Sequence, residues 1–142
     1  MSNWKKRVLV MEDNLSLALN WKETLELNDC EVVLSHSGDE AAAHLEQESF
    51  DLVVTDFVAS KQKDGLHVLT KLFAMGRKAP PAIAVTDAAV AAYGHEHVDI
   101  VLTQAARLGA RASLQKPFNP GELMLLAHDV WAQRDDALLL AA

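Results

Sequence analysis

Residues 8–14 read VLVMEDN, an apolar run that ends abruptly in two acids. Three further runs share this layout: LVVT at 52–55 before Asp56, AIAV at 82–85 before Thr86, and ASLQ at 112–115 before Lys116. Short runs that are rich in Val, Ile and Leu and do not alternate with polar residues are typical of strands buried on both faces. A fifth strand, EVVLS at 31–35, has flanking charges that favour a position nearer the edge of a sheet.

Helical patterns separate the apolar runs, and two of them begin at clear capping signals. Ser37 and Glu40 form an S-x-x-E capping box that opens a helix over 41–48. Asn119 is followed by a proline, whose fixed φ suits the first position of a helix. Another helix is expected directly after Asn14, because apolar residues recur there at helical spacing.

The interval after the third run is expected to hold a helix that Asp64 caps. The apolar stripe of this helix comprises Leu66, Leu69 and Phe73. Residues 87–108 are also expected to be mostly helical. Strands that alternate with helices in this way predict an α/β fold, with a parallel sheet covered by helices on both faces.

The polar residues at the ends of the runs are expected to meet, because ligands of open parallel sheets bind beyond the carboxyl ends of the strands. This edge would gather Glu12, Asp13, Asp56, Thr86 and Lys116. Three carboxylates at close range repel one another unless a cation neutralises them, and an all-oxygen set suits Mg²⁺. Asp56 is the candidate nucleophile toward a phosphoryl group, which would give an aspartyl-phosphate. Lys116 and Thr86 would then stabilise the phosphoryl oxygens.

The composition favours a single globular domain over residues 1–142, with its core at about 6–133 and a short apolar tail at 134–142. The formal net charge of −7 argues against nucleic acid as a direct partner. One cysteine, Cys30, excludes an intrachain disulfide, and no apolar stretch approaches the length of a membrane span. A cytoplasmic protein that does not bind membranes is expected.

The chain as a whole resembles a bacterial two-component response regulator, specifically its receiver domain in a stand-alone form like that of chemotaxis regulators. The segments that carry the resemblance are VLVMEDN at 8–14, DLVVTD at 51–56, AIAVT at 82–86 and KPF at 116–118. The resemblance implies a flavodoxin-like three-layer sandwich, in which five parallel strands in the order 2-1-3-4-5 are flanked by five helices. It also implies a signalling switch in a two-component system or phosphorelay.

The resemblance further implies a role for each site residue. Asp56 would take a phosphoryl group from a phosphohistidine on a histidine kinase or a histidine phosphotransfer protein. Glu12, Asp13, Asp56 and the backbone carbonyl of Val58 would bind Mg²⁺. Thr86 and Lys116 would contact the phosphoryl group, and the Lys116–Pro117 peptide bond would be cis. The chemistry would be limited to self-catalysed phosphorylation and dephosphorylation, so the protein would not be an enzyme in the usual sense.

Three features depart from the family pattern. Ser60 replaces a proline, Ser113 replaces an aromatic residue that couples to the threonine, and extra length lies within 87–96. A second interpretation is therefore a receiver-like interaction module that is not phosphorylated in the cell, and a third is a small α/β phosphatase. In the first two cases the output would be a contact with a downstream protein. The apolar tail packs on its own domain or forms a homodimer or partner contact, and the sequence leaves these options open.

Overall fold

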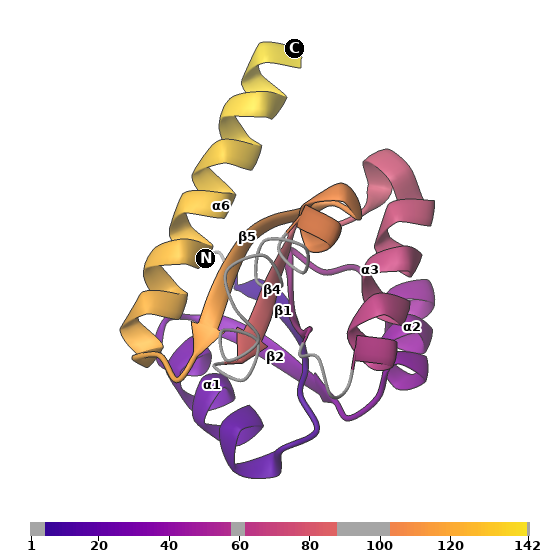
Figure 1. Ribbon diagram of the computed structural model, residues 1–142. Coiled ribbons are helices and arrows are strands. Elements are labelled where there is room, and N and C mark those ends of the chain that lie inside the picture. The colour runs from indigo at the N-terminus through magenta and orange to yellow at the C-terminus, as the bar shows by residue number, and fades with distance from the viewer. Residues whose placement is uncertain (1–4, 58–61, 88–102, 142) are drawn as a thin grey trace.

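A parallel sheet with helices on both faces forms the centre of the computed structural model, which describes residues 5–57, 62–87 and 103–141 (Figure 1). The strands are β1 (Lys6–Met11), β2 (Cys30–Ser35), β3 (Leu52–Asp56), β4 (Ala82–Asp87) and β5 (Ala110–Lys116). They pair in the order β2-β1-β3-β4-β5, and each pair is parallel. The expected strand order is thus confirmed.

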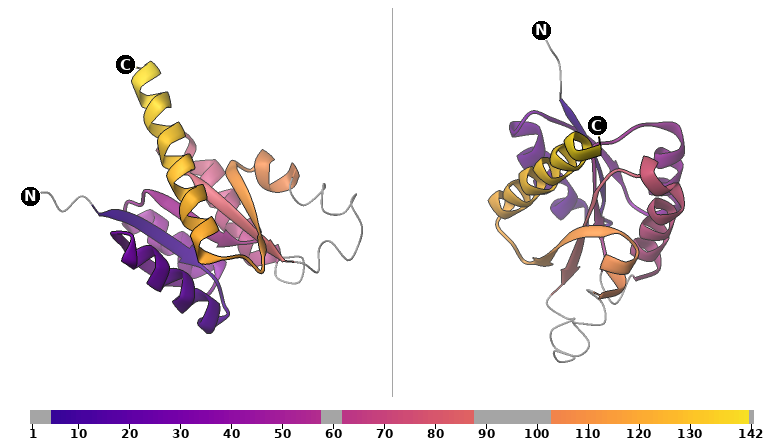
Figure 2. Two further views of the ribbon diagram at one scale, coloured as in Figure 1. Left: turned by 90° about the vertical axis from the view of Figure 1, so that its left-hand side faces the viewer. Right: turned by 90° about the horizontal axis from the view of Figure 1, so that it is seen from above.

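The two faces of the sheet are covered by different helices. The helices are α1 (Leu15–Leu27), α2 (Gly38–Gln47), α3 (Gln62–Met75), the short 3₁₀ helix η2 (Gly76–Lys78) and α6 (Pro120–Ala141), and residues 103–107 form a further helical turn. Helices α1 and α6 cover one face, and α2 and α3 cover the other (Figure 2). In β1, Val8 and Val10 face the first layer, whereas Leu9 and Met11 face the second.

Strand β5 differs from the fully buried strand that its sequence predicts. Its residues alternate between exposed and half-buried, and Ala112 and Leu114 pack into the cluster that contains α6. Ser113 is exposed. The reason is its place at the edge of the sheet, where α6 covers one face. The run ASLQ is better described as an alternating edge strand.

The predicted caps are largely confirmed. The side chain of Ser37 accepts a hydrogen bond of 3.1 Å from Glu40 N. Asn14, directly before the helix expected there, also acts as a cap and accepts a bond of 3.1 Å from Leu17 N. Asn119 accepts a bond of 2.8 Å from Gly121 N at the start of α6. These bonds satisfy backbone donors that helix N-termini otherwise leave unpaired.

The expectation for α3 was wrong in two respects. The helix begins at Gln62, so Asp64 lies in its first turn, where Asp64 Oδ1 accepts a 2.9 Å bond from Gly38 N of α2. Phe73 is 64% exposed and does not share the buried stripe, which instead contains Val68, Leu69 and Leu72. Tertiary packing of α3 against α2 and the sheet selected a neighbouring face.

Helix α6 continues through the apolar tail to Ala141. It does not pack the whole tail on its own domain, because Leu140 is 89% exposed. Figures 1 and 2 show the end of α6 projecting past the sheet. Within the described residues, no helix combines the length and apolar character that crossing a bilayer requires.

Candidate functional site

Three carboxylates converge at the carboxyl end of the sheet. Strands β1 and β3 are neighbours with Met11 opposite Thr55, so the residues that follow, Glu12 and Asp56, emerge side by side. One oxygen from each of Glu12, Asp13 and Asp56 lies within 4.8 Å of the others. The exposed fraction is 1% for Glu12 and 4% for Asp56, whereas Asp13 is exposed. The cluster is therefore open to solvent mainly at Asp13.

Lys116 brings a positive charge to this cluster from the end of β5. Its Nζ lies 3.3 Å from Asp56 Oδ1 and donates a hydrogen bond to Glu12 Oε1. The same ammonium lies 5.5 Å from the ring centroid of Trp21 in α1. The Lys116–Pro117 peptide bond is cis, as the resemblance implied.

Glu12 is held at both carboxylate oxygens. Oε1 accepts from Lys116, and Oε2 accepts a 3.0 Å bond from the backbone N of Asn14. The sequence did not predict the pairing of Glu12 with Lys116, since it gave Lys116 only the role of contacting the phosphoryl group. No local signal could have shown it, because the two residues are 104 positions apart.

Thr86 is the penultimate residue of β4 and lies at the same end of the sheet as the carboxylates. Asp56 lies opposite Val85 in the register of β3 and β4, so Thr86 follows directly, and this residue is 5% exposed. The structure thus places Thr86 at the expected edge of the sheet. Val58, the fourth predicted metal ligand, lies outside the described residues, as do Ser60 and most of the 87–96 segment.

A further site residue is Gly65, which the sequence analysis did not identify. A Cβ atom at this position would lie 2.2 Å from the carbonyl oxygen of Asp56 and 2.8 Å from a ring carbon of Phe57. Only a residue without a side chain allows the first turn of α3 to approach β3 so closely. The sequence signal for this close approach was a glycine at the start of the helix that was expected after Asp64.

The donor set fits Mg²⁺. All three side chains offer carboxylate oxygens, which are the hard ligands that Mg²⁺ prefers. Their three negative charges exceed the single charge of Lys116, so a divalent cation would neutralise the excess. Among the described residues, Glu12, Asp13 and Asp56 are the acids that lie close enough together to share an ion.

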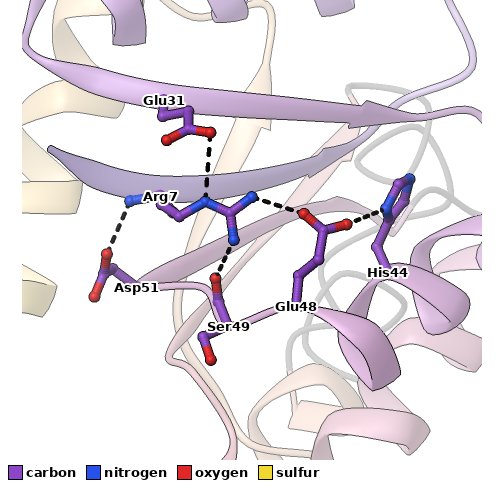
Figure 3. A network of polar contacts seen from close by, with 6 residues as sticks. All are labelled: Arg7, Glu31, His44, Glu48, Ser49 and Asp51. Carbon is purple, nitrogen blue, oxygen red and sulfur yellow. Dashed lines mark hydrogen bonds and ion pairs between the residues drawn. The ribbon is translucent and has the colours of Figure 1, made fainter.

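A second charged network lies at the opposite, amino end of the sheet (Figure 3). Arg7 donates to Glu48 Oε1 at 2.7 Å and to Ser49 O at 2.6 Å, and its Nε lies 3.6 Å from Glu31. His44 Nδ1 lies 2.7 Å from Glu48 Oε2. The hydrogen bonds from Arg7 and then His44 hold the pKa of Glu48 below its usual value.

Comparison with known proteins identifies the family of the chain. The family described as the response regulator receiver domain matches residues 8–128. The chain belongs to this family. It is 32% identical over 133 residues to the transcriptional regulatory protein CpxR of Klebsiella pneumoniae, and equally to that of Escherichia coli K12. Each match covers 90% of this chain and 52% of CpxR, so the chain spans about half the length of these curated relatives.

Solved structures show the same fold. A CheY-like receiver domain from Methanospirillum hungatei superposes with a TM-score of 0.76 at 25% identity, covering 94% of this chain and 98% of that domain. NtrX from Brucella abortus gives a TM-score of 0.80 at 20% identity, covering 96% of this chain and 29% of NtrX. The response-regulator and receiver-domain identification from sequence is thus confirmed, whereas the stand-alone arrangement stays a prediction.

Proposed function

We propose that this receiver domain is a phosphoryl-accepting switch in which Asp56 takes the phosphoryl group from a phosphohistidine. The observation that carries the proposal is the position of Lys116, whose Nζ lies 3.3 Å from Asp56 Oδ1 within a cluster of three carboxylates. An ammonium at this distance is already in place to contact the oxygens of an incoming phosphoryl group. The donor would be a histidine kinase or a histidine phosphotransfer protein.

In the transfer step, a carboxylate oxygen of Asp56 forms a bond to phosphorus while the bond from phosphorus to the donor's imidazole nitrogen breaks. The electron pair of that bond leaves with the imidazole. Lys116 stabilises the negative charge on the phosphoryl oxygens, and the hydroxyl of Thr86 donates a hydrogen bond to one of them. Glu12, Asp13 and Asp56 would hold Mg²⁺, which when bound neutralises the charge that the carboxylates and the phosphoryl group bring together.

The phosphorylated form carries about −2 of charge where Asp56 carried −1. Lys116 is then drawn toward the new oxygens and away from Glu12, and Thr86 is drawn in the same direction. These shifts change the surface around the ends of β4 and β5, which a downstream protein would recognise. The chemistry that we propose is limited to self-catalysed phosphorylation and dephosphorylation of Asp56. A cytoplasmic location stays a prediction.

The proposal is tested by incubating the protein with acetyl phosphate and Mg²⁺ and measuring its intact mass. We expect the wild type to gain one phosphoryl group and Asp56→Asn to gain none. Asp51→Asn, at the amino end of β3, is the matched control and should be phosphorylated like the wild type.

Each other outcome favours a different function. A wild type that gains no mass favours the interaction module that is not phosphorylated. Continuous release of phosphate from phosphate esters favours the phosphatase.

A further inference from the structure

A pocket of about 410 Å³ lies at the end of the sheet opposite Asp56. It is formed where α3 and η2 lead into β4 and where residues 108–109 lead into β5. Its lining includes Leu72, Phe73, Pro81, Leu108 and Arg111. Phe73 is 64% exposed, so it offers an apolar surface at the pocket.

The segments that build this pocket are basic, although the chain as a whole is acidic. Residues 72–82 and 103–111 contain four of the 13 basic residues, namely Arg77, Lys78, Arg107 and Arg111, and none of the 20 acids. All four are exposed. Arg111 lines the pocket itself, and the other three lie on the segments that form it. In a chain with a formal net charge of −7, this local excess of positive charge favours an occupant that is both acidic and apolar.

The end of α6 has this complementary chemistry. Asp135 and Asp136 are exposed, and Leu140 is 89% exposed. No basic residue lies in the last turn of the helix, so its carbonyl groups add an uncompensated partial negative charge. The end of α6, residues 135–141, is therefore an acidic segment that carries an apolar side chain.

The end of α6 and the pocket both lie at the amino end of the sheet. Trp131 Nε1 donates a 3.0 Å bond to Asp51 O, directly before β3, and Arg134 Nη1 lies 3.8 Å from Asp51 Oδ1. These contacts fix the direction of α6, and the helix after Trp131 rises roughly 15 Å further. Figure 1 shows this end pointing away from the body of the domain. It is thus presented outward rather than toward the pocket of its own chain.

We propose that two copies of this chain form a symmetric dimer in which residues 135–141 of each copy occupy the Phe73–Arg111 pocket of the other. A two-fold axis at the amino end of the sheet makes the two contacts identical and closes the assembly. The interface is separate from the phosphoryl site, which lies at the opposite end of the strands. It does not require phosphorylation.

The test exchanges the charges of the two surfaces. Arg77→Glu with Arg107→Glu and Arg111→Glu makes the surroundings of the pocket acidic, and Asp135→Lys with Asp136→Lys makes the end of α6 basic. Glu23→Lys with Glu26→Lys on α1 is the matched control for Asp135→Lys with Asp136→Lys, because both glutamates are exposed and the change in charge is the same in these two variants. Mass is measured by sedimentation equilibrium up to millimolar concentration, and circular dichroism checks that each variant is folded.

We expect the wild type and the control to be dimers and each charge-reversed variant to be a monomer. An equimolar mixture of the two variants should form a heterodimer, because each basic helix end then meets an acidic pocket and each acidic helix end meets a basic pocket. The mixture also separates loss of the contact from misfolding, since unfolded chains would not pair. A monomeric wild type, variants that remain dimers, or a mixture that stays monomeric would overturn the proposal.

Discussion

The two ends of the sheet both gather charges from distant parts of the chain, but the charges are exposed to water at one end and largely buried at the other. At the amino end, Arg7 is matched by Glu31 and Glu48, with side chains that are 28%, 59% and 32% exposed. At the carboxyl end, the side chain of Lys116 is 17% exposed, and the side chains of its partners Glu12 and Asp56 are 1% and 5% exposed. Asp13 adds a further negative charge.

This difference separates a structural network from a functional one. At the amino end, water reaches the charges and hydrogen bonds of ordinary length satisfy them, so each contact adds modestly to stability. At the carboxyl end, buried acids outnumber the lysine, an arrangement that costs folding free energy unless another cation or a reaction uses it. The variants below test that contrast, beginning with the largest expected effect.

Lys116→Met should destabilise the protein most. Without the ammonium, the carboxylate of Glu12 is buried with no cation beside it, and loss of one partner of a buried pair costs about 3 kcal/mol or more. Arg7→Met should cost less, because the glutamates it leaves behind are in contact with water. Urea denaturation measures both free energies of unfolding.

The double variant Glu12→Gln with Lys116→Met is the control for this explanation. It should recover most of the lost stability, since it removes the buried charge. If Lys116→Met and Arg7→Met cost the same, the proposed contrast between the two ends is wrong.

Mg²⁺ should raise the melting temperature of the wild type. A ligand that binds only the folded state adds about 2.7 kcal/mol at a concentration 100 times its Kd. Asp13→Asn should lose most of this increase, because one carboxylate is removed from the cluster. Asp51→Asn, at the amino end, should keep it, and an equal loss in both variants would show that the ion binds elsewhere.

Gly65→Ala should cost about 1–3 kcal/mol of stability, because the added methyl group would lie 2.2 Å from the carbonyl oxygen of Asp56 and forces the backbone apart. The same displacement should slow phosphorylation by acetyl phosphate. Gly121→Ala is the matched control in α6, where the nearest atom to the new Cβ is the side-chain oxygen of Asn119 at 3.3 Å. Unchanged phosphorylation in Gly65→Ala would contradict this prediction, because it would show that the displacement does not disturb Asp56.

The smallest effect concerns pH at the amino end. The pKa of Glu48 is lowered in the folded state, first by its hydrogen bond with Arg7 and then by that with His44. The stability that Glu48 contributes is therefore fully present above its unfolded pKa, near 4.3. This stability is lost as the pH falls through the lower pKa of the folded state. As the pH falls through this range, the melting temperature of Arg7→Met should therefore decrease less than that of the wild type. Parallel curves would exclude Arg7 as the cause.

Much of the fold could be predicted from sequence because the signals are local. Apolar runs that end in polar residues marked the strands, and side chains such as Ser37 and Asn119 marked helix starts, since capping involves neighbours within three residues. The order of the strands came from the family resemblance. Local patterns failed for Phe73 and for Asp64, where the packing of α3 against α2 decided which face is buried and which donor the carboxylate meets.

The sequence by itself determined which chemical groups stand at the carboxyl edge, because each one directly follows a strand. Only the tertiary structure decided how they are paired. Lys116 reaches Glu12 as well as Asp56, and Gly65 lets α3 approach the back of Asp56. These contacts join residues far apart along the chain, and they depend on the distance and direction between packed elements, which no short stretch of sequence encodes.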